Sequence, residues 1–251
     1  MLHGLHSPAE GRVRPAVRVP VSLLLLTAAA LMPRASTQAA ETNSDGVALA
    51  ILYDTSGSMQ DSVPDGSGKP TPKYLIANRA LAAIADKLEA FATNSDTGTS
   101  HRIDAGLFIF EGSGAREVVK FGSLDAPAMR DWAKSFASPV GGTPLGNALR
   151  QASKAVLRSP LSRKHVLVIT DGINTVGPAP AAVMPGLKRE ADRQQSAISF
   201  HFVAFDVSAS VFDPVKRAGA TVEAAADEKQ LNTQLNFILQ QQILLEKEGN
   251  P

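Results

Sequence analysis

The 251-residue sequence contains no cysteine. Disulfide bonds, thiolate nucleophiles and zinc sites with cysteine ligands are therefore excluded. Aromatic residues make up only 5% of the chain, and its Lys and Arg residues do not form a basic patch with them. Because proteins bind nucleic acids through clustered positive charge and stacking aromatic rings, we expect no nucleic-acid binding.

Long hydrophobic runs are also scarce, and the one that stands out lies near the N-terminus. Arginines at positions 12, 14 and 18 precede the apolar stretch Val19–Met32, and small residues such as Thr37 and Ala39 follow it. A stretch of about 14 residues is short for a bilayer core of roughly 30 Å. This order is typical of a secretory signal peptide, with cleavage after Ala39. An uncleaved anchor is the alternative interpretation.

Removal of residues 1–39 changes the charge balance of the chain. They carry four of the 25 basic side chains and one of the 24 acidic ones, which leaves 21 and 23 and a net charge of −2. We therefore predict a signal peptide over residues 1–39, a periplasmic or secreted protein, and no membrane span in the mature chain. Residues 45–247 are enough for one domain with a well-buried core.

Strand-like apolar runs alternate with amphipathic stretches of helical period along the remaining chain. The predicted strands are Val47–Tyr53, Ile103–Phe110, Glu117–Phe121, His165–Thr170, Ser199–Asp206 and Thr221–Ala224. The predicted helices are Lys73–Phe91, Ala126–Phe136, Pro144–Leu157, Met184–Gln195, Val211–Ala218 and Glu228–Glu246. Such alternation predicts an α/β fold, with a doubly wound, mostly parallel six-stranded sheet covered by helices on both faces.

Two segments depart from this regular alternation. The Gly112–Gly114 turn joins two strands directly, which predicts one antiparallel strand at an edge of the sheet. Asp61–Pro72 is rich in Asp, Gly, Ser, Lys and Pro and is expected to be a surface loop.

Three polar motifs carry the chemistry of this sequence. Asp54–Ser58 follows the first strand, Gly141–Pro144 introduces a helix, and Thr170–Gly172 follows the fourth strand. In the common strand order 3-2-1-4-5-6, the first and fourth strands flank the point where the order reverses, and ligands bind there. Carboxylate and hydroxyl oxygens suit hard cations such as Mg²⁺, Mn²⁺ or Ca²⁺.

Each motif also has a purely structural interpretation. Ser58 is a common type of helix cap, and Thr143 before Pro144 has the pattern of an N-cap followed by the first helical residue. Asp171 followed by glycine is typical of a turn after a strand. Capping and metal binding are compatible, because a hydroxyl oxygen has two lone pairs.

Together these motifs resemble the metal-ion-dependent adhesion site of von Willebrand factor type A (vWA) domains. The resemblance extends over essentially the whole chain after residue 39, in motif order and in the order of helices and strands. It implies direct cation binding by Ser56 and Ser58, and direct or water-mediated binding by Thr143. Asp54 and Asp171 would act mostly through waters. One coordination position would stay open for an Asp or Glu of a protein partner.

We therefore expect an exported binding protein and not an enzyme, with Mg²⁺ as the expected ion and Mn²⁺ or Ca²⁺ as alternatives. The alternative is a scaffold or accessory subunit of a larger extracytoplasmic assembly, in which the metal site is regulatory or vestigial. A metal-assisted hydrolase is a further hypothesis, but the motifs supply no obvious general base. Asp61–Pro72, which should lie beside the metal, is expected to contribute to the rim that recognises the partner.

Overall fold

The computed structural model describes residues 44–93 and 101–245, which belong to one compact unit. The predicted signal peptide and its cleavage site lie outside the described residues. Within these two ranges no helix is both long enough and apolar enough to cross a membrane.

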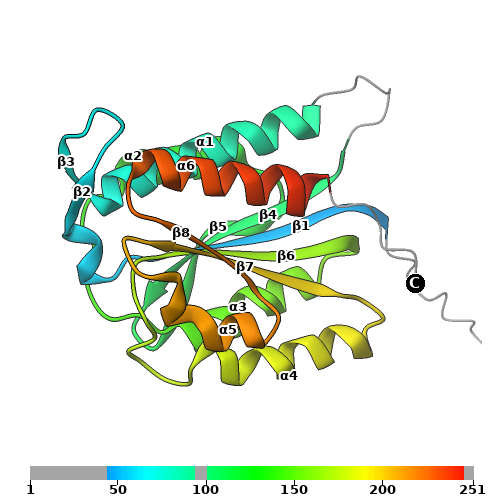
Figure 1. The fold of residues 1–251 in the computed structure, drawn as a ribbon. Coiled ribbons are helices and arrows are strands. Elements are labelled where there is room, and N and C mark those ends of the chain that lie inside the picture. The colour runs from blue at the N-terminus through cyan, green and yellow to red at the C-terminus, as the bar shows by residue number, and fades with distance from the viewer. Residues whose placement is uncertain (1–43, 94–100, 246–251) are drawn as a thin grey trace, which may run out of the picture. The chain divides into compact units, whose positions relative to one another are not determined.

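Six strands form the main sheet, in the order β5-β4-β1-β6-β7-β8 (Figure 1). They are β1 (Ser44–Tyr53), β4 (Ile103–Glu111), β5 (Gly114–Ser123), β6 (Leu161–Thr170), β7 (Ile198–Phe205) and β8 (Thr221–Ala225). Counted along the chain, this order is 3-2-1-4-5-6, as predicted. All pairs are parallel except β4 with β5, which confirms the single antiparallel strand at the edge.

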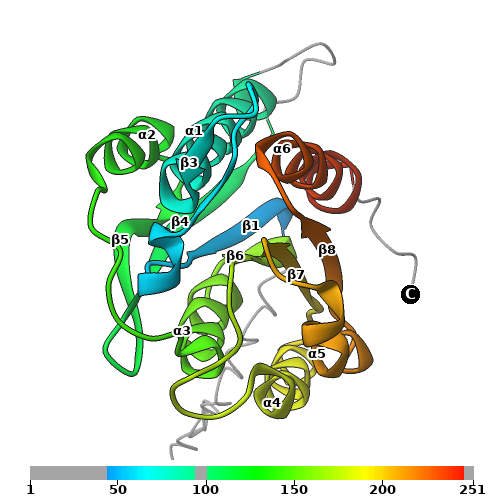
Figure 2. The same cartoon turned by 60° about the vertical axis from the view of Figure 1, so that its left-hand side comes forward.

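Helices cover both faces of the sheet, as Figure 2 shows. One face carries α1 (Lys73–Thr93), α2 (Ala126–Ser135) and α6 (Glu228–Phe237), and the other carries α3 (Leu145–Leu157), α4 (Pro180–Arg193) and α5 (Asp213–Arg217). Each face has its own apolar core. The central strand β1 contributes to both cores, because successive side chains of a strand point to opposite faces. Its residues from Val47 to Tyr53 are fully buried, which explains its continuous apolar run.

The segment Asp61–Pro72 is not the simple surface loop that its composition indicates. It forms a small hairpin of β2 (Ser62–Pro64) and β3 (Pro70–Pro72), and the side chains of Val63 and Thr71 are buried. A short 3₁₀ helix, η1 (Gly57–Gln60), connects β1 to this hairpin. The segment lies mostly at the surface, as predicted, but its two strands were missed because strands of three residues are too short to show an alternating pattern.

Other element boundaries differ from the predictions in smaller ways. Strand β6 begins four residues before the predicted start, and α4 begins at Pro180, where proline fits the first helical turn. The predicted helix Val211–Ala218 is a 3₁₀ turn, η2 (Ala209–Phe212), followed by α5. The last predicted helix is α-helical to Phe237 and then π-helical over η3 (Ile238–Leu244). Its predicted last residue, Glu246, lies outside the described residues.

Candidate metal centre

Backbone hydrogen bonds join the three loops that carry the polar motifs. The first loop is tied to the second, because Val140 N donates to Thr55 O (2.7 Å) and Gly57 N donates to Gly141 O (3.1 Å). The second loop is tied to the third by Thr175, whose N donates to Thr143 O (2.9 Å). The three motifs therefore meet at the carboxyl ends of β1 and β6, where the strand order reverses.

Asp54 is fully buried directly after β1. Its Oδ1 accepts a hydrogen bond from Ser56 N (2.7 Å), and its Oδ2 accepts one from Thr170 Oγ1 (2.5 Å). Burial raises the pKa of this carboxyl to about 6; the hydrogen bonds oppose the shift, and the nearby Asp171 charge adds to it. A bound cation would compensate this buried negative charge.

A chain of hydroxyls links the first loop to Asp171. Ser56 Oγ lies 3.1 Å from Ser58 Oγ, and Ser58 Oγ donates to Asp171 Oδ1 (2.8 Å). The side chains of Ser56 and Asp171 are buried, whereas Ser58 is exposed. Solvent therefore reaches this group from the side of Ser58.

Thr143 lies against the third loop and does not cap α3. The N-cap position of α3 belongs to Pro144, and the first-turn amide of Gly146 donates to Asn174 Oδ1 (3.3 Å), not to Thr143. The Thr143 hydroxyl is close to Gly172, since a Cβ added to that glycine would stand 3.6 Å from Thr143 Oγ1. Within the described residues this hydroxyl has no hydrogen-bond partner, so the structural interpretation of Thr143 as an N-cap is wrong.

The five predicted ligands, which we call the candidate metal centre, therefore come from three loops joined to one another: Asp54, Ser56, Ser58, Thr143 and Asp171. Two ligands in neighbouring positions of an octahedral Mg²⁺ site, each about 2.1 Å from the ion, lie about 3.0 Å apart. The 3.1 Å between Ser56 Oγ and Ser58 Oγ is compatible with that spacing. The donors are all oxygens, so their chemistry fits a hard cation.

The candidate metal centre has few carboxylates for a metal site. In residues 44–93 and 101–245, no group of three or more His, Cys, Asp or Glu side chains is placed to bind one ion. Binding would therefore depend on the three hydroxyls, on water and on an external ligand. A cation bound with so little protein charge would remain strongly attractive to an added carboxylate.

A buried lysine beside the centre was missed by the sequence analysis. Lys73 Nζ lies 2.7 Å from Asp171 Oδ2, 3.4 Å from Asp206 Oδ2 and 3.8 Å from Asp61 Oδ2. Only 4% of the Lys73 side chain is exposed. Burial alone would lower the pKa of this amine, but its hydrogen bonds and charge interactions with Asp171 and Asp206 raise it above its ordinary value. We call these four residues the lysine cluster.

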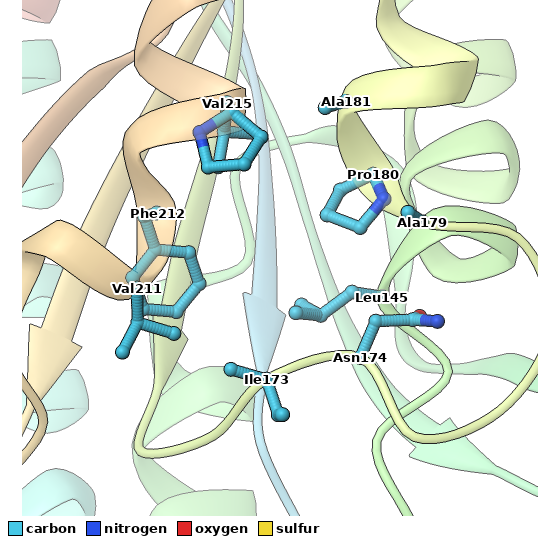
Figure 3. A pocket seen from close by; sticks show the side chains of 10 residues that line it. Leu145, Ile173, Asn174, Ala179, Pro180, Ala181, Val211, Phe212 and Val215 are labelled. Atoms are coloured by element: carbon cyan, nitrogen blue, oxygen red, sulfur yellow. The ribbon is translucent and has the colours of Figure 1, made fainter.

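An apolar pocket of about 190 Å³ adjoins two of the loops that carry the candidate metal centre. Figure 3 shows the side chains that line it. Its walls come from η2 and α5 on one side and from the first turns of α3 and α4 on the other. The lining residues are Leu145, Ile173, Asn174, Ala179, Pro180, Ala181, Val211, Phe212, Pro214 and Val215. Leu145 and Ile173 each stand two residues after a predicted ligand, so the pocket and the centre share two loops. Ile173 is 55% exposed, and Val140, on the second loop, is 77% exposed.

The β2–β3 hairpin is fixed by a second group of acidic side chains. Asp65 Oδ1 accepts hydrogen bonds from Ser67 N and Lys69 N, and its Oδ2 accepts one from Thr71 Oγ1. Glu228 Oε2, at the start of α6, accepts a hydrogen bond from Gly66 N (2.7 Å). The same carboxylate forms a two-point ion pair with Arg79 of α1. We call Asp65, Arg79 and Glu228 the hairpin anchor.

No protein-family model and no curated protein sequence matches this chain. Its fold is similar to those of several solved structures. A D319A mutant of the PilB minor pilin from Streptococcus sanguinis has 16% identity and a TM-score of 0.57, over 79% of this chain and 61% of that one. Proximal thread matrix protein 1 from the mussel byssus was solved with zinc in its metal-ion-dependent adhesion site (MIDAS) motif. It has 15% identity and a TM-score of 0.56, over 78% of this chain and 47% of that one. This chain thus spans less than two thirds of either protein.

A third similar structure is the vWF domain of the type V pili tip protein Mfa5 from Porphyromonas gingivalis. It has 12% identity and a TM-score of 0.55, over 78% of this chain and 95% of that domain. This coverage and the strand order show that residues 44–245, where described, have the fold of a vWA domain.

Proposed function

We propose that this chain is an exported vWA-type binding protein without catalytic activity. It engages a protein partner through a divalent cation held by Asp54, Ser56, Ser58, Thr143 and Asp171. The partner supplies an Asp or Glu side chain to the open coordination position, and Mg²⁺ is the proposed ion. The observation that carries this proposal is the convergence of the five oxygen-bearing side chains, on three loops that are hydrogen-bonded to one another.

The surface around the centre supports a protein as the ligand. Val140 and Ile173 expose large apolar side chains on the same loops as Thr143 and Asp171. Exposed apolar groups next to polar groups are common in protein interfaces, which combine apolar contacts with a smaller number of polar ones. The similar pilin and pilus-tip structures support export and a role in assembly or adhesion.

One observation favours the scaffold alternative. Lys73 already neutralises part of the Asp171 charge, so the site could persist in a folded protein without a metal. In that case the protein would bind its partner through other surfaces, and the partner complex would survive removal of divalent ions.

The central experiment measures metal binding first and partner binding second. Isothermal titration of the purified chain with Mg²⁺ and Mn²⁺ should show one site, which Asp54→Ala abolishes without loss of the folded circular-dichroism spectrum. Affinity capture from the native envelope fraction should then yield a partner with Mg²⁺ present, but not with EDTA or with Asp54→Ala.

The matched control is Asp131→Ala, which removes an exposed aspartate of α2 that forms a surface pair with Lys134. It should leave both metal and partner binding unchanged. A partner complex that resists EDTA would contradict the metal-bridged mechanism and support the scaffold alternative. Hydrolysis of a phosphoester or peptide that is lost in Asp171→Ala would contradict the non-enzymatic role.

A further inference from the structure

Asp171 lies between two positive charges: the ammonium of Lys73 and the proposed metal ion. Its Oδ1 accepts the hydrogen bond from Ser58, a predicted metal ligand, while its Oδ2 lies 2.7 Å from Lys73 Nζ. The carboxylate therefore connects the candidate metal centre to the lysine cluster.

The position of Lys73 is unfavourable unless the carboxylates compensate it. Lys73 is the first residue of α1, and a positive charge at a helix N-terminus opposes the helix dipole. A buried amine also loses its hydration, which must be replaced by charge partners. Asp206 supplies one of them from a left-handed backbone conformation (φ 57°), which few residues other than glycine, Asn and Asp adopt. Three separate segments thus converge on one buried ammonium.

We propose that Lys73 is a built-in counter-cation of the metal centre, which competes with the bound ion for the charge of Asp171. This inference rests on the proposed metal binding and specifies how tightly the site holds its ion. The ammonium lowers the affinity of the partner-free site for divalent cations, because it repels the ion and takes part of the Asp171 charge. The ion then gains more from a partner carboxylate, so ion and partner bind with positive coupling.

A purely structural role for Lys73 makes the opposite prediction. If Lys73 served only to orient Asp171, its removal would loosen that carboxylate and weaken metal binding. If Lys73 is a competing cation, its removal frees the carboxylate and tightens metal binding. The sign of the change therefore separates the two roles.

The test is isothermal titration calorimetry at low ionic strength, in which the full chain is titrated with Mn²⁺ alone. Lys73→Met keeps the length of the side chain and removes its charge, and it should bind Mn²⁺ at least about tenfold more tightly than the wild type. The matched control is Lys69→Met, which removes an exposed charge from the hairpin loop of the same segment. It should change the affinity by less than about twofold, because exposed charges are screened.

A second variant acts in the other direction and leaves Lys73 in place. Asp206→Asn removes a carboxylate that competes for the ammonium, so Lys73 should pair more fully with Asp171 and Mn²⁺ should bind about threefold more weakly. In the Lys73→Met background the same substitution should have a smaller effect.

The possible outcomes are distinct. If neither the wild type nor Lys73→Met binds Mn²⁺, the proposed metal function fails. If the wild type binds and Lys73→Met binds equally or more weakly, the counter-cation role is overturned. If Lys73→Met does not fold, the Asp206→Asn variant decides alone. A Mn²⁺ affinity of Asp206→Asn equal to or above that of the wild type then overturns the counter-cation role of Lys73.

Discussion

Acidic side chains lie in two places at the carboxyl end of the sheet, and the pKa of Asp54 in one shifts in the opposite direction to the pKa values of Asp65 and Glu228 in the other. In the candidate metal centre, burial raises the pKa of Asp54 to about 6. In the hairpin anchor, hydrogen bonds from Ser67 hold the pKa of Asp65 well below its usual range. The Arg79 hydrogen bonds likewise lower the pKa of Glu228. The same chemical group is thus disfavoured as an anion at one place and favoured at the other.

The difference lies in what surrounds each carboxylate. Asp65 and Glu228 accept hydrogen bonds from backbone amides, and Glu228 also faces a guanidinium, so their charges are satisfied within the protein. Asp54 is desolvated and close to a second carboxylate, Asp171, and its hydrogen bonds only partly compensate. A carboxylate group satisfied from within stabilises the fold, whereas one left under-compensated is suited to bind a cation.

The largest expected effect is that of Asp54→Asn, which keeps the shape of the side chain and removes its charge. We expect Mg²⁺ affinity to fall by about 10–100-fold, the range for residues that act on a metal through bound water. In EDTA the variant should be more stable than the wild type by roughly 1–3 kcal/mol at about pH 7, because a buried charge with a raised pKa is removed. Calorimetric titration and urea unfolding measure the two quantities.

Asp131→Asn is the control for this variant, since it removes an exposed charge and should change neither quantity. If Asp54→Asn is less stable than the wild type without Mg²⁺, the contrast between Asp54 and the hairpin anchor is contradicted. The charge of Asp54 would then be compensated within the protein, as the charges of Asp65 and Glu228 are.

A smaller effect is expected from Asp65→Ala in the hairpin anchor. The substitution removes an acceptor for two backbone amides and the Thr71 hydroxyl, so the hairpin should open more often. Amides of residues 62–72 should exchange with deuterium about tenfold faster. Mg²⁺ affinity should stay within about twofold, and Ser67→Ala, which removes only one donor, should have a weaker effect. A loss of Mg²⁺ affinity as large as that of Asp54→Asn would show that the two groups are not independent.

The sequence predicted the sheet well because parallel strands covered on both faces are continuous apolar runs. Val47–Tyr53 and the residues after His165 are of this kind, and motifs that follow such strands meet at one edge. The convergence of Asp54 and Asp171 follows from the strand order, whereas Thr143 lies between α2 and α3 and is placed beside them by the hydrogen bonds between the loops. Element type was therefore predictable where burial leaves an uninterrupted apolar run, as in the strands, or a helical period, as in the helices.

The lysine cluster and the hairpin anchor could not be predicted in the same way. Lys73 has no local pattern that distinguishes it from a solvated lysine, since its partners Asp61, Asp171 and Asp206 come from separate loops. Its position at the first turn of a helix, where a cation is unfavourable, was the available signal. Glu228 and Gly66 are likewise distant in sequence, and only the packing of α6 beside α1 brings them together.

The smallest expected effect is that of Glu228→Gln, and its pH dependence has a defined sign. The folded pKa of Glu228 is lowered from its ordinary value of 4.5, so the unfolded chain binds the proton more readily than the folded one. The stabilisation is fully present above about pH 4.5 and is lost as the pH falls through the lowered folded pKa. Since half of the Arg79 side chain is exposed, the ion pair contributes only about 0.5–1 kcal/mol.

Urea unfolding of the wild type and Glu228→Gln at about pH 7, 5 and 3 measures this contribution. The wild type should be more stable at the two higher pH values, and the difference should shrink at the lowest one. Salt should reduce the difference at about pH 7, because the pair is partly exposed. The absence of any difference over this range would mean that Glu228 acts through the Gly66 hydrogen bond, which glutamine can also accept, and not through its charge. The hairpin would then be fixed by geometry alone, and the electrostatic contrast with Asp54 would rest on Asp65.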